Sequence, residues 1–190
     1  VLQHYTGLND KPGPASAISV TTGTHSAEES SIGISRSVSI SGGSNTASDT
    51  VLLLRNIASG EPNTETSGVF EVSGTGVTLT VSKLTLTLPS RTTTLRRNDE
   101  PATPTLSHPM LTCLSGGSVS LSTVCFNASV SSVAAILGKS LIDANGGTLS
   151  LSSVTVSSVT LLNLPLFTVS SSHSPYLTVS STSTFTDIHR

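Results

Sequence analysis

Residues 142–156 read Ile142-Asp143-Ala144-Asn145-Gly146-Gly147-Thr148-Leu149-Ser150-Leu151-Ser152-Ser153-Val154-Thr155-Val156. Apolar and polar residues alternate on both sides of the Asn-Gly-Gly turn, which is the period-2 pattern of strands with one buried face. The alternation slips by one residue at Ser152-Ser153, and a flat strand would then turn half of its apolar side chains into water. We therefore expect a strand, a glycine turn, a second strand, a corner at the two serines and a further strand.

The same pattern recurs along the chain. Close copies occupy residues 69–86 and 111–126, and a looser copy with a longer Ser-rich turn occupies residues 167–185. Residues 32–40 match the second half of that looser copy. Repeated supersecondary units of this length predict stacked coils, in which insertions project from loops without disturbing the stack.

The phase slip also recurs, at Ser82-Lys83 and at Ser122-Thr123. Three identical slips predict a built-in bend, and short strands joined by fixed corners predict a β-solenoid. Candidates for an additional strand in a coil are residues 51–54 and 159–162. Only residues 130–141 show helical spacing of apolar residues, so a short inserted helix is expected there if anywhere.

We predict an all-β fold, a section of a right-handed parallel β-helix, with a β-sandwich as the alternative. Residues 1–30 are expected to be irregular or a partial coil, and residues 31–190 to form coils interrupted by a polar loop insertion at 89–109. The predicted continuous interior consists of Phe70, Val72, Leu79, Val81, Leu84, Leu86, Val119, Leu121, Val124, Phe126, Leu149, Leu151, Val154 and Val156.

The glycine turn followed by apolar-x-apolar-Ser-x-apolar-x-apolar resembles the pectin-lyase-like right-handed β-helix repeats of large surface and adhesin-type proteins of bacteria and unicellular eukaryotes. The resemblance covers residues 32–188. The resemblance implies the fold more than it implies a function. Relatives of that fold include proteins that bind hosts, proteins that extend a stalk and enzymes that cleave acidic polysaccharides.

Composition excludes several classes of function. The 190 residues include 37 Ser and 28 Thr, only 11% charged residues, 3% aromatic residues and no Trp, and the net charge is −2. Nucleic-acid binding needs clustered Lys and Arg or aromatic stacking platforms, so we expect no nucleic-acid partner. No apolar run is long enough to span a bilayer. The start at Val1 without a signal-like segment suggests a section of a longer secreted or cell-surface protein.

The residues predict no catalytic site, cofactor or metal. Polysaccharide-cleaving sites need grouped carboxylates, whereas the acids here are scattered, and Glu71 and Asp143 share one repeat position as surface residues. The five histidines are far apart in the sequence. We therefore expect a non-enzymatic structural or adhesion scaffold. The alternative is a carbohydrate-active β-helix, a polysaccharide lyase or glycoside hydrolase, with its site largely outside this piece.

Two candidate sites remain. The polar insertion 89–109 carries Arg91, Arg96, Arg97 and His108 and is a candidate interaction loop, because solenoids present function on such loops. Asn127 begins the only N-glycosylation sequon and follows an inward Phe126, so an exposed amide is expected. Candidate partners are glycans or other surface proteins.

The cysteines and the chain end complete the expectations. Cys113 falls on an inward position and Cys125 on an outward one, which opposes a disulfide. The last strand ends without a polar cap after Phe185 and Ile188, leaving an open slice of the apolar core. End-to-end self-association of the isolated piece is therefore expected.

Overall fold

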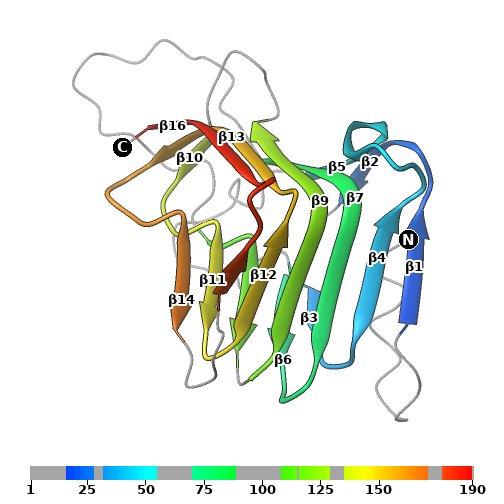
Figure 1. Cartoon of the computed structure of the whole chain (residues 1–190), viewed down its shortest axis with the longest axis horizontal. Coiled ribbons are helices and arrows are strands. Elements are labelled where there is room, and N and C mark those ends of the chain that lie inside the picture. The colour runs from blue at the N-terminus through cyan, green and yellow to red at the C-terminus, as the bar shows by residue number, and fades with distance from the viewer. Residues whose placement is uncertain are drawn as a thin grey trace.

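The computed structural model describes residues 16–27, 32–54, 70–88, 108–114, 116–128, 135–170 and 177–189. In these residues the chain is an all-β parallel β-helix (Figure 1). Its strands are β1 Ser16–Val20, β2 Gly23–Ala27, β3 Ile32–Ile34, β4 Val38–Gly42, β5 Thr50–Leu54, β6 Phe70–Ser73, β7 Thr78–Leu88, β8 Leu111–Leu114, β9 Ser118–Ala128, β10 Ala135–Leu137, β11 Ile142–Asn145, β12 Thr148–Ser152, β13 Thr155–Leu161, β14 Phe167–Ser170, β15 Leu177–Val179 and β16 Thr184–His189. A 3-10 turn, η2, spans Ala47–Asp49.

The strands form three walls. The front wall, facing the viewer in Figure 1, runs β1-β4-β7-β9-β12-β15 and uses the first halves of β7 and β9. The upper wall contains β2, β5, the second halves of β7 and β9, β13 and β16, and the rear wall runs β14-β11-β8-β6-β3. Neighbouring strands in every wall are parallel. The β-sandwich alternative is therefore wrong, because sandwiches are built from antiparallel strands.

The predicted corners are confirmed. Lys83, Thr123 and Ser153 have φ of 56°, 56° and 53°, in the left-handed region, and they separate the front wall from the upper wall. A single left-handed residue turns the chain sharply, and it shifts the alternation by one position so that apolar side chains on both sides point inward. Side chains other than glycine adopt this conformation at a cost of about 1–2 kcal/mol. The core on both sides of the bend has to offset that cost.

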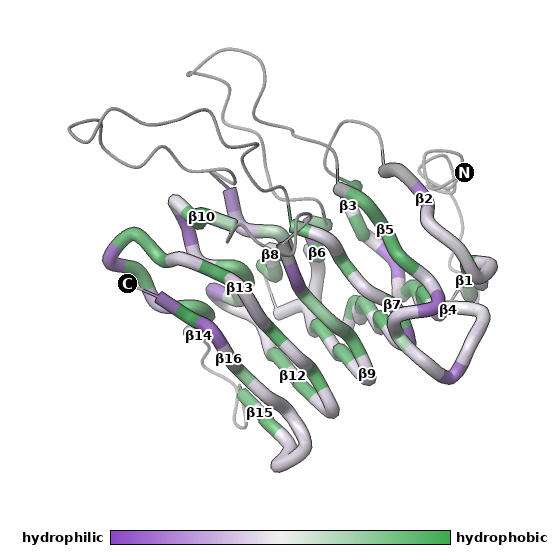
Figure 2. The backbone as a smooth tube through the Cα atoms, turned by 90° about the horizontal axis from the view of Figure 1, so that it is seen from above, coloured by the Kyte–Doolittle hydropathy of each residue, from purple (hydrophilic) through white to green (hydrophobic). Residues whose placement is uncertain are grey.

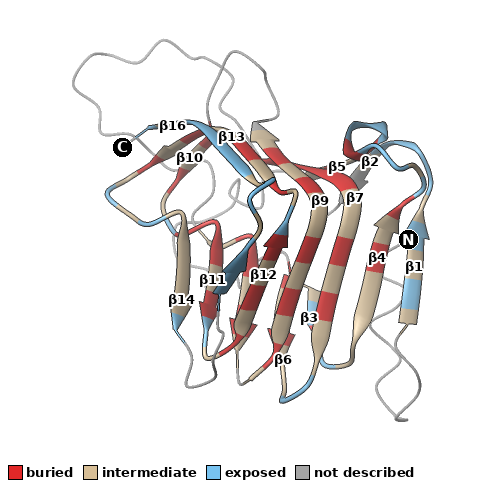
Figure 3. Ribbon diagram, viewed as in Figure 1, coloured by how far each residue is buried: buried red, intermediate tan, exposed pale blue. Residues whose placement is uncertain are grey.

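The interior is one continuous core. All fourteen predicted interior residues are buried, and they belong to a single hydrophobic cluster. Figure 3 shows buried positions along the strands of the middle coils. Equivalent positions stack in columns from coil to coil, as in Val81, Leu121 and Leu151. Figure 2 shows hydrophobic residues, in green, alternating with more hydrophilic residues, in white or purple, along the strands.

Two local expectations are corrected by the pairing. Ile32–Ile34 pairs with Phe70–Val72, and Val38–Ser41 pairs with Leu79–Ser82. Residues 32–40 therefore begin a complete copy of the repeat rather than the second half of one. The described part of 130–141 contains a strand, β10, and no helix. Ala135 and Leu137 point into the core, Ile136 between them is only partly buried, and the strand pairs with Val159–Leu161.

The two candidate additional strands have different roles. Residues 51–54 belong to β5, which is an upper-wall strand paired with residues 85–87. Residues 159–161 extend β13 beyond a second left-handed bend at Ser158 and pair with β10. The segment 43–49 before β5 covers Thr85, whose hydroxyl donates to the Ala47 carbonyl at 3.1 Å. Thr85 therefore points away from the core and is nevertheless buried.

Candidate functional site

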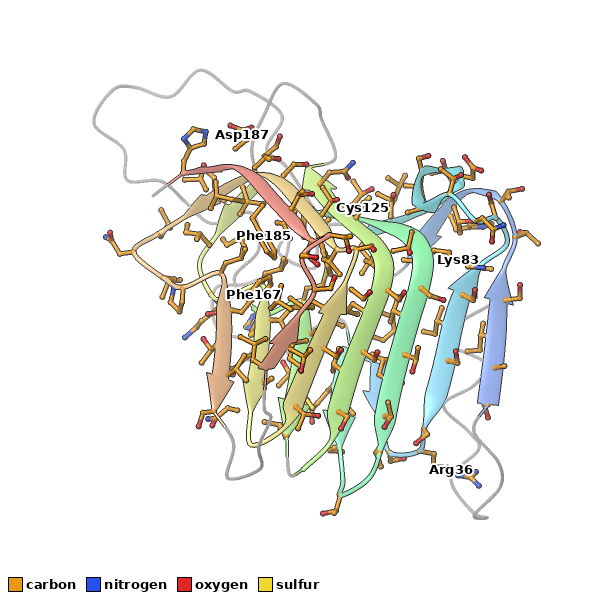
Figure 4. All side chains as sticks on the ribbon, viewed as in Figure 1. Arg36, Lys83, Cys125, Phe167, Phe185 and Asp187 are labelled. Carbon is orange, nitrogen blue, oxygen red and sulfur yellow. The ribbon has the colours of Figure 1, made fainter. Side chains whose placement is uncertain are left out.

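The outer face of the front wall is an array of small hydroxyl groups. Alternate residues of its strands face outward and align between coils in three columns (Figure 4). Neighbouring columns are about 6.6 Å apart and neighbouring coils about 4.8 Å apart. Except for Ala17, every described position in the array is Ser or Thr: Ser37, Thr78, Ser118 and Thr148; Ser39, Thr80, Ser120, Ser150 and Thr178; Ser19, Ser41, Ser82, Ser122, Ser152 and Ser180.

Some of these hydroxyls join successive coils. Thr148 Oγ1 donates to Ser118 Oγ at 2.8 Å, and the backbone N–H of Thr78 donates to Ser37 Oγ at 3.1 Å. Among the residues that the structure describes, no position in the three columns is charged or aromatic. The face can therefore offer many weak hydrogen bonds to a neutral surface, but it has no base that would activate a serine as a nucleophile.

The acidic residues of the rear wall stay apart. Glu71, Thr112, Asp143 and Thr168 occupy one outward column, so a threonine separates the two acids. One carboxylate oxygen of Asp143, Oδ1, is buried without a hydrogen-bond partner. Within the described ranges, no three or more His, Cys, Asp or Glu side chains are grouped closely enough to hold a metal ion.

A cluster of polar side chains surrounds Asp187 on the upper wall. His189 Nε2 bonds to Asp187 Oδ1 at 2.7 Å, and Ser158 Oγ donates to Asp187 Oδ2 at 3.0 Å. These hydrogen bonds, that of His189 first, hold the pKa of the Asp187 carboxyl below its ordinary value. The serine and the imidazole each bond to the carboxylate and not to each other. The cluster therefore lacks the contact between base and nucleophile that a catalytic triad needs.

The C-terminal end of the solenoid exposes core positions. Leu177, Val179 and Phe185 are 39%, 45% and 40% exposed, although they stand in the inward columns of Leu149, Leu151 and Val156. Figure 3 shows β16 as exposed where the preceding coil is buried. The Phe185 ring packs edge-on against Phe167, with centroids 5.6 Å apart.

The predicted site residues have different outcomes. Arg91, Arg96 and Arg97 lie outside the described residues, and His108 is half-buried at the end of that insertion. Asn127 lies in β9 beside Thr87 of β7; its side chain is only partly exposed and its Oδ1 is buried without a hydrogen-bond partner. The first two residues of the sequon, Asn127 and Ala128, therefore lie in a strand.

The thiols face as expected. Cys113 is buried beside Val72, Cys125 is partly exposed beside Thr85, and both are free. Burial raises the pKa of the Cys113 thiol, and its hydrogen bond with the backbone of Thr148 partly opposes that shift.

Sequence reasoning missed two features that depend on pairing between coils. One is the Asp187 cluster, whose members Ser158 and Asp187 both have positive φ and meet only because β13 and β16 are neighbours. The other is the contact of Lys83 with Asn45 in the preceding coil. No spacing in the sequence signals either contact.

In the described part of the chain, no helix has the length and apolarity needed to cross a bilayer. No protein-family model, curated protein or solved structure matches the chain.

Proposed function

We propose that this chain is a non-enzymatic scaffold or adhesion section of a secreted or cell-surface protein. The observation that supports the proposal best is the uncharged hydroxyl array of the front wall, which continues over the rows from β1 to β15. A face of small hydroxyls on a packed core is suited to exposure to solvent. Coils that contact only their neighbours extend such a face without a limit set by the core.

The resemblance to pectin-lyase-like surface repeats supports the same proposal. Its partners would be glycans or other surface proteins, bound through the insertion 89–109 with Arg91, Arg96, Arg97 and His108. Guanidinium groups bind carboxylate and sulfate groups through paired hydrogen bonds. Asn127 would carry a glycan on the secretory route, provided that its sequon is reached before β9 is paired.

Exposure is tested by labelling intact producing cells with a membrane-impermeant amine reagent. We expect the protein to be labelled and a cytosolic marker to remain unlabelled. Recovery of the protein only from the cytosolic fraction, without label, would contradict a surface role.

Binding through the insertion is tested on arrays of neutral and anionic glycans. Replacing Arg91, Arg96 and Arg97 together by Ser should abolish binding to anionic glycans. The matched control is Lys139→Ser, which removes an exposed charge from a different turn. Equal binding by the parent protein and the triple variant would remove the insertion from the proposal.

The absence of catalysis is tested with neutral and uronic-acid polysaccharides. We expect neither new reducing ends nor unsaturated products. Turnover that is lost in Asp143→Asn would instead establish a carbohydrate-active enzyme.

A further inference from the structure

The turn between β11 and β12 contains an Asn-Gly pair. In this sequence Gly follows Asn only at Asn145-Gly146, and no Asp is followed by Gly. Asn145 is exposed at the end of β11, and Gly146 has a φ of 92°, in the left-handed region. Glycine has no side chain to shield its backbone nitrogen. The pair therefore has the composition in which an Asn side chain loses ammonia most readily.

The reaction joins two groups that are neighbours in the chain. The backbone nitrogen of Gly146 forms a bond to the side-chain carbonyl carbon of Asn145. The bond from that carbon to the side-chain nitrogen breaks, and ammonia leaves with the proton of the Gly146 amide. Water then opens the five-membered imide. Opening at the side-chain carbonyl leaves Asp, and opening at the main-chain carbonyl leaves isoaspartate. Water is thus the one co-reactant of the deamidation.

The fold holds the reacting nitrogen in a hydrogen bond between coils. The Gly146 N–H donates to the Ser170 carbonyl of β14, directly after the pairing of Asn145 with Ser170 (Figure 1). Asn145 is itself a strand residue, and the extended ψ of a strand is not the ψ that closes the imide ring. The amide proton and the ring geometry are therefore both available only when β11 and β14 separate.

We propose that Asn145 is a modification site whose deamidation is gated by the fold. The reaction proceeds when β11 separates from β14, and it is blocked while the Gly146 N–H is bonded to Ser170. Local openings of this kind occur in native proteins with free energies below that of global unfolding. This inference rests on the fold and not on the proposed surface role.

The isoaspartate product cannot re-form the turn. Isoaspartate carries the main chain through the side-chain methylene group, so the chain gains one atom between Ala144 and Gly146. The Gly146 carbonyl accepts a hydrogen bond from the Gly116 N–H at 2.7 Å. A Cβ placed at Gly147 would overlap Cys113 Sγ. Because the turn is bonded on one side and filled on the other, the added atom has no place, and the modification acts in one direction.

The test follows Asn145 by peptide mapping and mass spectrometry, with isoaspartate and Asp peptides separated by chromatography. The whole chain is incubated folded and in denaturing urea, at one temperature and one mildly alkaline pH. We expect deamidation of Asn145 to be about tenfold or more faster in the denatured chain. Equal rates would overturn the gate. The internal control is Asn163, which precedes Leu164; an Asn163 that reacts faster than Asn145 in urea would overturn the site.

Hydrogen exchange measures the same gate in the parent chain. The Gly146 N–H has to leave Ser170 both to exchange and to react, so the two processes require one opening. The slowing of Gly146 exchange on folding should therefore agree with the slowing of Asn145 deamidation to within about threefold. Deamidation that is slowed far less than exchange would mean that the imide forms without opening, and it would overturn the proposal.

Val169→Ala locates the opening. Val169 pairs with Ala144 and is partly buried against the core, so its truncation weakens the contact of β14 with β11 without changing the turn. Deamidation of the folded chain should accelerate by about threefold or more. Val38→Ala is the matched control, since Val38 of β4 is also partly buried against the core but lies several coils away. Equal acceleration by both variants, or none by Val169→Ala, would contradict an opening between β11 and β14.

Discussion

The ammonium group of Lys83 donates to Asn45 Oδ1 at 2.8 Å, so the corner of one coil is bonded to the insertion of the coil before it. Lys83 is also the left-handed residue that turns the chain between the front and upper walls. The corner position therefore has two effects: its backbone sets the phase of the strands, and its side chain contacts the neighbouring coil. The hydroxyl of the equivalent Ser153 forms a hydrogen bond with that of Thr182 instead, at 2.9 Å, so this corner is bonded to the coil that follows it.

Thr123 is the corner residue least suited to its conformation, because β-branched side chains are outliers at positive φ. Thr123→Asn should raise the free energy of unfolding by about 1 kcal/mol, since Asn tolerates the left-handed region. Ser120→Asn, on the front wall, should not stabilise, because Asn is unfavourable in strands. Urea denaturation measures both changes. A less stable Thr123→Asn would show that the threonine side chain contributes more than its strain costs.

Leu151 is buried in the core, between Leu121 and Val179 in its column. Leu151→Ala should lower the free energy of unfolding by about 2–5 kcal/mol, because it removes buried surface and leaves a cavity. Ser150→Ala, the outward neighbour, is the matched control and should be nearly neutral. Equal effects in thermal or urea unfolding would contradict the column alignment.

Gly147 has no room for a side chain. A Cβ placed there would overlap Cys113 Sγ and lie 2.8 Å from the carbonyl oxygen of Gly117. Gly147→Ala should therefore destabilise the protein by more than 1 kcal/mol, as overpacking does. Gly33→Ala is the control, since a Cβ at Gly33 meets nothing within 4 Å. Comparable melting temperatures for the two variants would show that the turn relaxes around the added methyl group.

The two thiols should react at different rates. Cys125 is partly exposed, whereas Cys113 is buried and its pKa is raised. Cys113 is therefore less accessible to a reagent, and a smaller fraction of it is in the reactive thiolate form. A thiol-specific reagent should modify one cysteine rapidly in the folded protein and the second only after denaturant is added. Peptide mapping should identify the fast site as Cys125. Fast modification at Cys113 would mean that the turn beside Gly147 opens readily.

Asp187 should make stability depend on pH in the acid range. Its pKa is lowered in the folded state, so its contribution is fully present above the ordinary value of 3.8 and is lost as the pH falls through the lowered pKa. Asp187→Asn should therefore be less stable than the parent at neutral pH, and the difference should shrink in strong acid. Denaturation curves at several pH values measure this. A difference that grows on acidification would contradict the assignment.

Much of the fold follows from local sequence. Alternation in residues such as Leu149-Ser150-Leu151 reflects the geometry of a strand with one buried face, so the interior positions could be read directly. The slip at Ser152-Ser153 requires a local bend if Val154 is to point inward, and the left-handed corner at Ser153 provides that bend. These properties depend on neighbouring residues and therefore appear in the sequence.

The contacts between coils were decided by the tertiary structure alone. The sequence pattern alone places residues 32–40 in the wrong half of a repeat, because their partners Phe70–Val72 and Leu79–Ser82 lie beyond a long stretch that does not follow the repeat. The same reason hid the pairing of Ser158 with Asp187 and the place of His25 below Leu52 in the column that ends at Phe185. Alternation specifies which face of a strand is buried. The register between neighbouring coils, which decides the residues that stack in one column, is set only when the coils pack on one another. The register that buries the most apolar surface over the whole column is the one adopted.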